Sequence, residues 1–393
     1  NGDTQMEIQW YNASRSPNEA ILKSHKNTSQ FLEYGSPDDY RNYAGILGCT
    51  EAETFSKIYG GVQVVNSGHM GYTDALDWAM PVDGHGGSLA LFCPEERIWK
   101  DNVKNLLGTK DECGENAYSA QRRTFYKERD MWVNQYGDPT YVDDFGWPGL
   151  SGRMLERSVI SSMPFETSFC VGLGKHRFVE GEKQNTQDWY HSGVQSIMPT
   201  WRYWIENKEG LDVTIDWDDA YNFGSSLKIN GKLTAGDHLM RLYKTMIPVT
   251  SGGTLRLVYK TSTPGSVEVR LATESKVKGE MVTLSNPTVT DKNGWTIAEY
   301  DLSQLNGKTV YMISLNMKSE TEVADYVLSL GELAVLPAAY APSAVAVSNF
   351  STTSVLGEEK GDIRVTWDYS YNSDFDHFDI YTETADGTRK LVG

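Results

Sequence analysis

Residues 51–66, EAETFSKIYGGVQVVN, switch from a helical to an extended pattern within one short stretch. EAETFSK (51–57) is typical of a short helix, and IYGGVQVVN (58–66) is typical of a strand. The flanking sequence repeats this alternation, with strands predicted at 6–13, 29–35 and 86–96 and helices at 16–26 and 73–80. Strand starts recur roughly every 22–30 residues, which is the step expected of β/α units around a parallel sheet.

Polar and aromatic side chains stand at the end of each predicted strand. In α/β barrels the carboxyl ends of the strands carry the functional groups. The sequence therefore predicts one functional rim, although ordinary surface polarity also places such residues at strand ends. The side chains at these ends are Tyr11, Asn12, Glu33, Tyr34, Gln63, Asn66, Cys93 and Glu95.

Four β/α units are half of the eight that close a barrel. Half a barrel leaves sheet edges and an apolar face exposed. We therefore interpret residues 1–204 as the C-terminal half of a (β/α)8 barrel whose other half precedes Asn1. Within this region, residues 100–165 are rich in Tyr, Trp, Asp and Gly and show no regular period. We predict an irregular site loop or lid there.

The pattern changes near residue 205, where apolar residues begin to alternate with period two between Gly, Asn and Asp turns. This predicts an antiparallel jelly-roll sandwich over 205–336, followed by a Pro/Ala linker at 337–344. Residues 345–393 have the layout of a partial fibronectin type III-like or immunoglobulin-like domain, with Trp367 as its core anchor. The predicted fold class is multidomain, α/β followed by all-β.

Composition excludes some classes of function. The formal net charge of −17 disfavours nucleic acid and anionic membranes as partners, and no run of about 18 apolar residues could insert into a membrane. The chain has 11 Trp and 22 Tyr residues. Aromatic faces pack on sugar rings, so this content favours saccharide handling, although β-rich cores use the same residues.

The cysteines and acidic residues form no recognisable metal motif. Cys49, Cys93, Cys113 and Cys170 fit no zinc spacing, so we predict free thiols and leave a Cys93–Cys113 disulfide open. The acidic run DWDD (216–219) is either a calcium ligand set in the jelly roll or a solvated turn.

An aromatic stretch, WYHSGVQSIMPTWRYWIE (189–206), lies between the predicted barrel and the predicted sandwich. Its rings are either a platform for sugar or the seam between the two domains. Because Trp189 and Trp201 follow the last barrel strand and precede the first sandwich strand, we predict a packing seam.

Several segments, taken in one order, resemble glycoside hydrolase family 85, the endo-β-N-acetylglucosaminidases. Family members read approximately W-Y-D-[SA], L-F-A-P, F-x-T-x-F-x-x-G-x-G and L-P-T-W-x-W at the matching places. Segments after these resemble the family's jelly-roll module. The matching segments are IQWYNAS (8–14), GSLALFCPE (87–95), PFETSFCVGLGKHRFVEGE (164–182) and VQSIMPTWRYW (194–204).

The resemblance implies hydrolysis of the β-1,4 bond in the di-N-acetylglucosamine core of the N-linked glycans of glycoproteins. In this family the substrate's acetamido oxygen attacks the anomeric carbon, a Glu acts as acid and base, and an Asn two residues earlier orients the acetamido group. The resemblance places that pair upstream of Asn1, so this segment alone is expected to be inactive. Asn207-Lys208-Glu209 has the same spacing but falls in a charged turn, and we interpret it as coincidence.

The family's substrate-facing positions transfer to six residues. Tyr11 matches the W-Y-D tyrosine, Asn12 replaces the following Asp, and Gln63 replaces an acidic residue. Phe31 and Tyr34 lie on a strand that brings aromatic groups to the cleft, and Trp147 of the long loop is a candidate for stacking on a mannose arm.

The resemblance predicts a secreted, periplasmic or cell-surface bacterial enzyme that requires no cofactor. The changes at Asn12 and Gln63 leave an alternative open, namely a non-catalytic glycan-binding surface protein.

Overall fold

A computed structural model of the chain describes residues 7–24, 26–33, 47–48, 50–63, 87–93, 113–138, 141, 149–150, 158–199, 203–276, 279–341, 345–357, 361–371, 377–387 and 389–391. The predicted helix at 73–80 lies outside these residues. No helix in the described part of the chain has the length and apolarity to cross a membrane.

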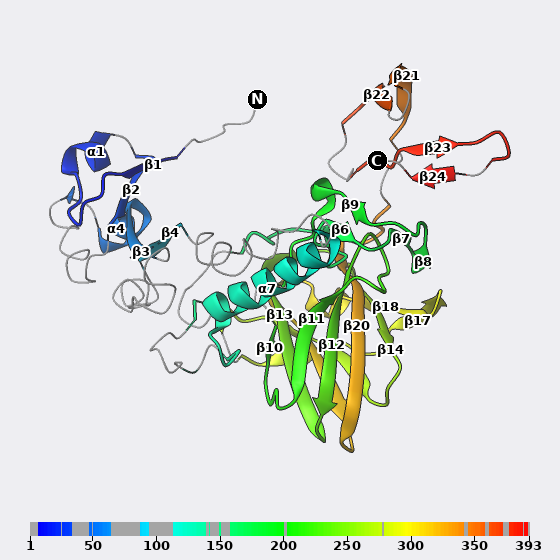
Figure 1. Cartoon of the computed structure of the whole chain (residues 1–393). Helices are drawn as coiled ribbons and strands as arrows, with labels where there is room; N and C mark the ends of the chain where they lie inside the picture. Colours follow the sequence, from blue (N-terminus) through cyan, green and yellow to red (C-terminus); the bar gives the residue numbers. More distant parts are fainter. Residues whose placement is uncertain are drawn as a thin grey trace.

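The N-terminal part contains a four-stranded, fully parallel sheet (Figure 1). Its strands follow the chain order β1 (Ile8–Tyr11), β2 (Thr28–Leu32), β3 (Ile58–Gln63) and β4 (Ser88–Phe92). Helix α1 (Glu19–Ser24) connects β1 to β2, and α4 (Glu51–Lys57) directly precedes β3. The predicted succession of four strands is confirmed.

Helix α4 has the bounds predicted for it. Thr50 caps its start in a reciprocal pair with Glu53, in which each side chain bonds the other's backbone N–H. The helix ends at Lys57, and Ile58 already has extended backbone angles. A small core between the helices and the sheet is formed by Leu22, Leu32, Phe55 and Ile58.

The prediction of an irregular stretch over 100–165 is wrong for its central part, which forms helix α7 (Cys113–Val133). Tyr118 and Phe125 lie seven residues apart on one face of this helix and are both buried. The ring of Tyr118 meets Trp217 at 4.9 Å and that of Phe125 meets Tyr203 at 5.7 Å. The helix is therefore held by packing against the β-sandwich that follows it, as Figure 1 shows.

The central part of the chain is a sandwich of two antiparallel sheets. One has the order β10–β13–β19–β15–β16, and the other has the order β11–β12–β20–β14–β18–β17, with β5 added beside β20. The bounds are β5 (Phe165–Thr167), β10 (Trp204–Ile205), β11 (Leu211–Asp216), β12 (Ser226–Leu233), β13 (Gly236–Val249), β14 (Thr254–Thr261), β15 (Ser266–Ala272), β16 (Met281–Thr283), β17 (Thr288–Lys292), β18 (Trp295–Asp301), β19 (Lys308–Ser319) and β20 (Val323–Leu336).

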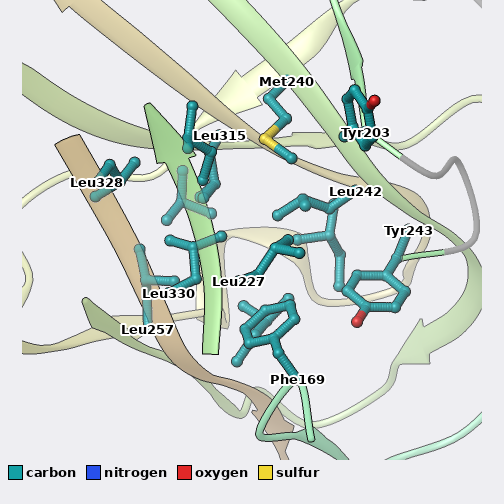
Figure 2. Packing of buried hydrophobic residues seen from close by; sticks show 14 of the residues in the cluster. Phe169, Tyr203, Leu227, Met240, Leu242, Tyr243, Leu257, Leu315, Leu328 and Leu330 are labelled. Carbon is teal, nitrogen blue, oxygen red and sulfur yellow. The ribbon is translucent and has the colours of Figure 1, made fainter. Parts of the chain in front are cut away.

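One apolar core lies between the two sheets (Figure 2). Leu242 and Leu315 enter it from one sheet, and Leu257 and Leu330 enter it from the other. Phe169, from the segment before the sandwich strands, fills one end of this core and is fully buried. The period-two alternation predicted from 205 to 336 is seen in β11, where buried residues alternate with exposed or partly exposed ones, whereas β20 is buried on both faces over most of its length.

Two strands that precede residue 205, or overlap it, belong to the sandwich sheets. β5 pairs with β20 through Phe165–Val335 and Thr167–Leu333, and β10 pairs with β13. The predicted domain boundary at 204/205 stays a prediction, but hydrogen bonds of the sandwich reach back to residue 165.

The segment between β5 and β10 contains two short strand pairs, β6 (Leu173–Gly174) with β9 (Trp189–Tyr190) and β7 (Phe178–Val179) with β8 (Glu182–Lys183), and a 3-10 turn, η3 (Ser192–Val194). Trp189 is buried against Cys170, Val194 and Phe223 and so offers no open platform for a sugar. Trp201 lies outside the described residues. A second 3-10 turn, η4 (Ser303–Leu305), precedes β19.

The C-terminal part forms two hairpins, β21 (Val347–Leu356) with β22 (Gly361–Tyr369), and β23 (Tyr381–Glu383) with β24 (Arg389–Leu391). Trp367, the predicted core anchor, is partly exposed and meets Phe378 edge to face at 4.9 Å. The fibronectin-like assignment stays a prediction.

Candidate functional site

Three aromatic rings meet at the carboxyl edge of the parallel sheet. Tyr11 ends β1, Phe92 ends β4, and Phe31 lies near the end of β2. The ring centroid of Tyr11 lies 5.0 Å from that of Phe31 and 5.7 Å from that of Phe92. We call these three residues the aromatic cluster.

The contact between Tyr11 and Phe92 indicates that the sheet is curved. β1 and β4 are separated by two other strands, and in a flat sheet they would lie about 14 Å apart. Their rings nevertheless stack at 5.7 Å. The side chains therefore converge on the concave face of the sheet, and Tyr11 remains 41% exposed there.

A glycine makes room for this convergence. Gly61 lies in β3, and a Cβ atom at this position would stand 2.3 Å from Cε2 of Phe31 and 2.5 Å from the carbonyl oxygen of Leu32. Both distances are too short for a real contact. The Phe31 ring thus lies directly over the backbone of Gly61.

Amide side chains form the polar part of the site. Asn12 follows Tyr11, and its Oδ1 accepts a 2.9 Å hydrogen bond from Nε2 of Gln30, a fully buried residue of β2. Gln63 ends β3, is half-buried, and pairs in register with Phe92. Amides donate and accept hydrogen bonds to hydroxyl groups but do not exchange protons at neutral pH.

Desolvation and two neighbouring side chains affect the ionisation of Tyr11. Its pKa is raised above the ordinary value by desolvation first and then by electrostatic repulsion from Glu33 and Cys93. Cys93 directly follows β4 and has a left-handed backbone (φ 49°). The phenol of Tyr11 is therefore a neutral hydrogen-bonding group at physiological pH.

The structure brings together Tyr11 and Phe31 of the predicted site, with Gln63 beside Phe92, while the side chain of Asn12 bonds to Gln30. Tyr34 and Trp147 lie outside the described residues. The sequence analysis missed Phe92 and Gln30. Phe92 had a usable signal, because it lies in the predicted strand 86–96 directly before Cys93, which the sequence placed on the functional rim, whereas Gln30 is a polar residue near the start of the predicted strand 29–35.

The remaining sequence candidates lie elsewhere. Asn207 and Glu209 belong to the turn between β10 and β11 of the sandwich, where Asn207 donates to the carbonyl of Asp237. Cys93 is a free thiol, so the disulfide left open between it and Cys113 is not formed, and Cys170 is free as well.

The DWDD carboxylates are each occupied by a lysine. Asp216 pairs with Lys228 at 3.0 Å, Asp218 with Lys175 at 3.1 Å and Asp219 with Lys260 at 2.6 Å. Within the described residues no group of three or more His, Cys, Asp or Glu side chains is arranged to hold a metal ion. Calcium in the sandwich stays an untested prediction, and these ion pairs give it no support.

Comparison with known proteins identifies the part of the chain that carries the site. The model of the family described as Glycosyl hydrolase family 85 matches residues 3–177, which include all four parallel strands. Residues 3–177, which we call the family-85 segment, are thus similar to glycosyl hydrolase family 85. The resemblance seen in the sequence is thereby confirmed, and the aromatic cluster and its amides are features of a family-85 segment.

Curated relatives of the family-85 segment share one description. The chain is 28% identical over 232 residues to the human cytosolic endo-β-N-acetylglucosaminidase, covering 56% of this chain and 26% of the relative. It is 26% identical over 201 residues to cytosolic endo-β-N-acetylglucosaminidase 1 of Arabidopsis thaliana, covering 44% of this chain and 29% of the relative. The matched regions thus span little more than a quarter of these relatives.

A solved structure matches nearly the whole fold. The glycoside hydrolase domain of Endo-D from Streptococcus pneumoniae superposes with a TM-score of 0.73 at 25% identity, covering 99% of this chain and 61% of that one. The chain therefore spans about three fifths of the Endo-D domain.

These comparisons correct the predicted location. We expected a secreted, periplasmic or cell-surface bacterial protein. The curated relatives contradict this prediction, because all six are named as cytosolic enzymes. The matching Endo-D structure is bacterial. Aromatic cleft residues serve a glycosidase in any compartment, so the sequence features used here contained no information on location.

The raised pKa of Tyr11 is testable by ultraviolet titration of the family-85 segment in its full protein. The difference between wild type and Tyr11→Phe should show one phenol that ionises above pH 10, because desolvation, Glu33 and Cys93 oppose its negative charge. In a Cys93→Ser background the pKa of Tyr11 should fall towards 10, since one of the groups that repel its negative charge is removed. A Tyr11 phenol that titrates at or below pH 10 in wild type would contradict the assignment.

Proposed function

We propose that the whole protein containing this chain is an endo-β-N-acetylglucosaminidase that cleaves the β-1,4 bond in the di-N-acetylglucosamine core of N-linked glycans. The supporting observation is the family-85 match over residues 3–177, the segment that holds the aromatic cluster. The human and Arabidopsis relatives are named for this activity. An exposed Tyr11 ring beside the Asn12 amide suits a substrate with apolar sugar faces and an acetamido group.

The proposed reaction is substrate-assisted and retains the anomeric configuration. The acetamido oxygen of the substrate forms a bond to the anomeric carbon as the glycosidic bond breaks, giving an oxazoline that water then opens. The acid and the amide that orients the acetamido group are proposed to lie upstream of Asn1. Tyr11 is proposed to face the acetamido or oxazoline group, and its high pKa keeps it a neutral hydrogen-bonding partner.

The domain assignments that accompany this function are proposals too. The curvature deduced from Tyr11 and Phe92 supports an arc of a (β/α)8 barrel in which the missing strands complete the circle. The two antiparallel sheets around one core support a jelly roll. No cofactor is needed by this chemistry.

The experiment is digestion of glycoproteins that carry high-mannose, complex or trimmed N-glycans with the full-length protein. We expect mass spectrometry to find released glycans and a peptide that retains one N-acetylglucosamine. Glu209→Gln is a matched control that should leave the rate unchanged, since Glu209 lies in the sandwich turn. Failure to release any of the three glycan classes would overturn the proposal.

A second candidate is a glycan-binding protein without hydrolysis. It is favoured by Asn12 and Gln63, whose amides stand where the family has acidic residues and cannot act as acid or base. Retention of the protein on an immobilised N-glycan without release of that glycan would favour this candidate.

A further inference from the structure

Gln30 is a buried polar residue with both ends of its side chain engaged. It lies in the middle of β2 and has no exposed surface. Its Oε1 accepts the backbone N–H of Asn18 at 2.7 Å, and its Nε2 donates to Oδ1 of Asn12 at 2.9 Å. A buried amide satisfied at both ends is held in one orientation.

The orientation of this pair follows from the backbone donor. The N–H of Asn18 can only donate, so Gln30 must turn its oxygen towards Asn18 and its amino group towards Asn12. Asn12 must then turn Oδ1 towards Gln30 to accept that bond. The amino group of Asn12 is consequently directed away from Gln30, on an exposed residue next to Tyr11.

The loop that carries Asn12 is fixed at several further points. Asn18 caps α1, since its Oδ1 accepts the backbone N–H of Ile21 at 3.1 Å. The carbonyl of Ser14 accepts the N–H of Glu33 at 3.0 Å. Ala13, directly after Asn12, has a left-handed backbone (φ 51°), which requires such support because it carries a Cβ.

We propose that Gln30 is a positioning residue that presents Asn12 as a hydrogen-bond donor at the carboxyl edge of the sheet, aimed at an acceptor oxygen of the sugar. The acceptor is an acetamido carbonyl or a hydroxyl oxygen, the groups that an N-acetylglucosamine unit offers. This inference rests on the proposed function for the identity of the ligand. The donor polarity of Asn12 itself rests on the hydrogen bonds alone.

The test is a double-mutant cycle in the full-length protein, with a fluorescent N-glycan that has an intact di-N-acetylglucosamine core. Asn12→Ala removes the donor, and Gln30→Leu removes the group that orients it. Each should raise KM about tenfold, as expected for one lost hydrogen bond to a buried ligand group, with kcat changed less than about twofold. In the Asn12→Ala background, Gln30→Leu should add nothing further to KM.

The non-additivity separates positioning from a general loss of structure. If Gln30 only supported the fold, the KM of the double variant would rise by the product of the two single effects. That result would overturn the proposal. Asn12→Asp keeps an acceptor for Gln30, so it should preserve the melting temperature yet still raise KM. An Asn12→Asp variant with wild-type KM would overturn the proposal as well.

Side-chain NMR supplies a readout that needs neither activity nor a variant that folds. In the wild-type protein the amino protons of Gln30 should exchange slowly, whereas those of Asn12 should exchange quickly and shift when di-N-acetylchitobiose is added. Protected Asn12 amino protons in the free protein would overturn the proposal. If wild type cleaves no N-glycan but shows the expected exchange pattern, the proposed function fails and the donor polarity stands.

Discussion

Gly61→Ala is expected to destabilise the parallel sheet by about 2–3 kcal/mol, the cost of forcing an extra methyl group into a packed interior. The new Cβ would overlap Cε2 of Phe31 and the carbonyl oxygen of Leu32 at 2.3 and 2.5 Å. The backbone oxygen cannot move without distorting β2, so the Phe31 ring must leave its position against Tyr11. Thermal unfolding followed by circular dichroism measures the loss.

The same variant should also disturb the site, because Phe31 contacts both other rings of the aromatic cluster. Gly279→Ala is the matched control, since a Cβ there would meet its neighbours at 3.5 Å or more, and it should leave stability unchanged within about 0.5 kcal/mol. Equal unfolding midpoints for Gly61→Ala and Gly279→Ala would show that the ring does not occupy the space above Gly61.

Asp379→Ala is expected to lower the free energy of unfolding by about 3 kcal/mol, because it leaves the buried guanidinium of Arg177 without its carboxylate partner. Only 4% of the Arg177 side chain is exposed, and its Nη2 lies 2.7 Å from Oδ2 of Asp379. The guanidinium also stacks on Phe223 at 4.8 Å. Hydrogen exchange of residues 377–383 should accelerate, since this ion pair joins them to the segment that packs on the sandwich.

Two comparisons make the Asp379 result interpretable. Glu383→Ala removes an exposed ion pair with Arg389 and should change stability by less than about 1 kcal/mol. Arg177→Met combined with Asp379→Ala should recover part of the loss, because an apolar chain can replace a buried charge. A full 3 kcal/mol loss in the double variant would rule out the uncompensated charge as the cause.

Acidic pH should weaken the ion pair between Arg177 and Asp379. Burial raises the pKa of Asp379, but the hydrogen bond from His377 and the charge of Arg177 outweigh it and hold the pKa below its ordinary value. A carboxyl with a lower pKa in the folded state stabilises fully above its unfolded pKa, near 3.9, and the contribution disappears as the pH falls through the folded value. The exchange difference between wild type and Asp379→Ala should therefore shrink as the pH falls below about 3.9 and vanish once the pH is below the folded-state pKa of Asp379.

The parallel sheet was predictable because its signals are local. β3 has a mainly apolar sequence, and α4 has a sharp start at Thr50 and a sharp change to extended backbone at Ile58. Helix α7 was not predictable in the same way. Its buried residues Tyr118 and Phe125 are separated by a mainly polar stretch, SAQRRT. The rings that cover them, Trp217 and Tyr203, come much later in the chain.

The candidate site was predictable only in part, for a related reason. Tyr11 was found because a predicted strand end and the family resemblance both mark it, whereas Phe31 was found from the family resemblance alone. Gln30 was missed because a polar residue in a buried strand has no periodic signal, and its role appears only once Asn12 and Asn18 are seen on either side of it. Sequence pattern reveals which side chains are apolar, but not which buried amide has two partners.

The pairing of β5 with β20 has a consequence for biosynthesis. The three residues of β5 bond to partners about 170 positions later in the chain. Contacts of such long sequence separation form slowly, since the entropy of closing a long loop is lost before the contact contributes any stabilising energy. As the polypeptide leaves the ribosome, the backbone N–H and C=O groups of β5 that bond to β20 stay unpaired until β20 has been synthesised. During this interval the unpaired strand edge is prone to aggregation, and we expect chaperone binding to be strongest then.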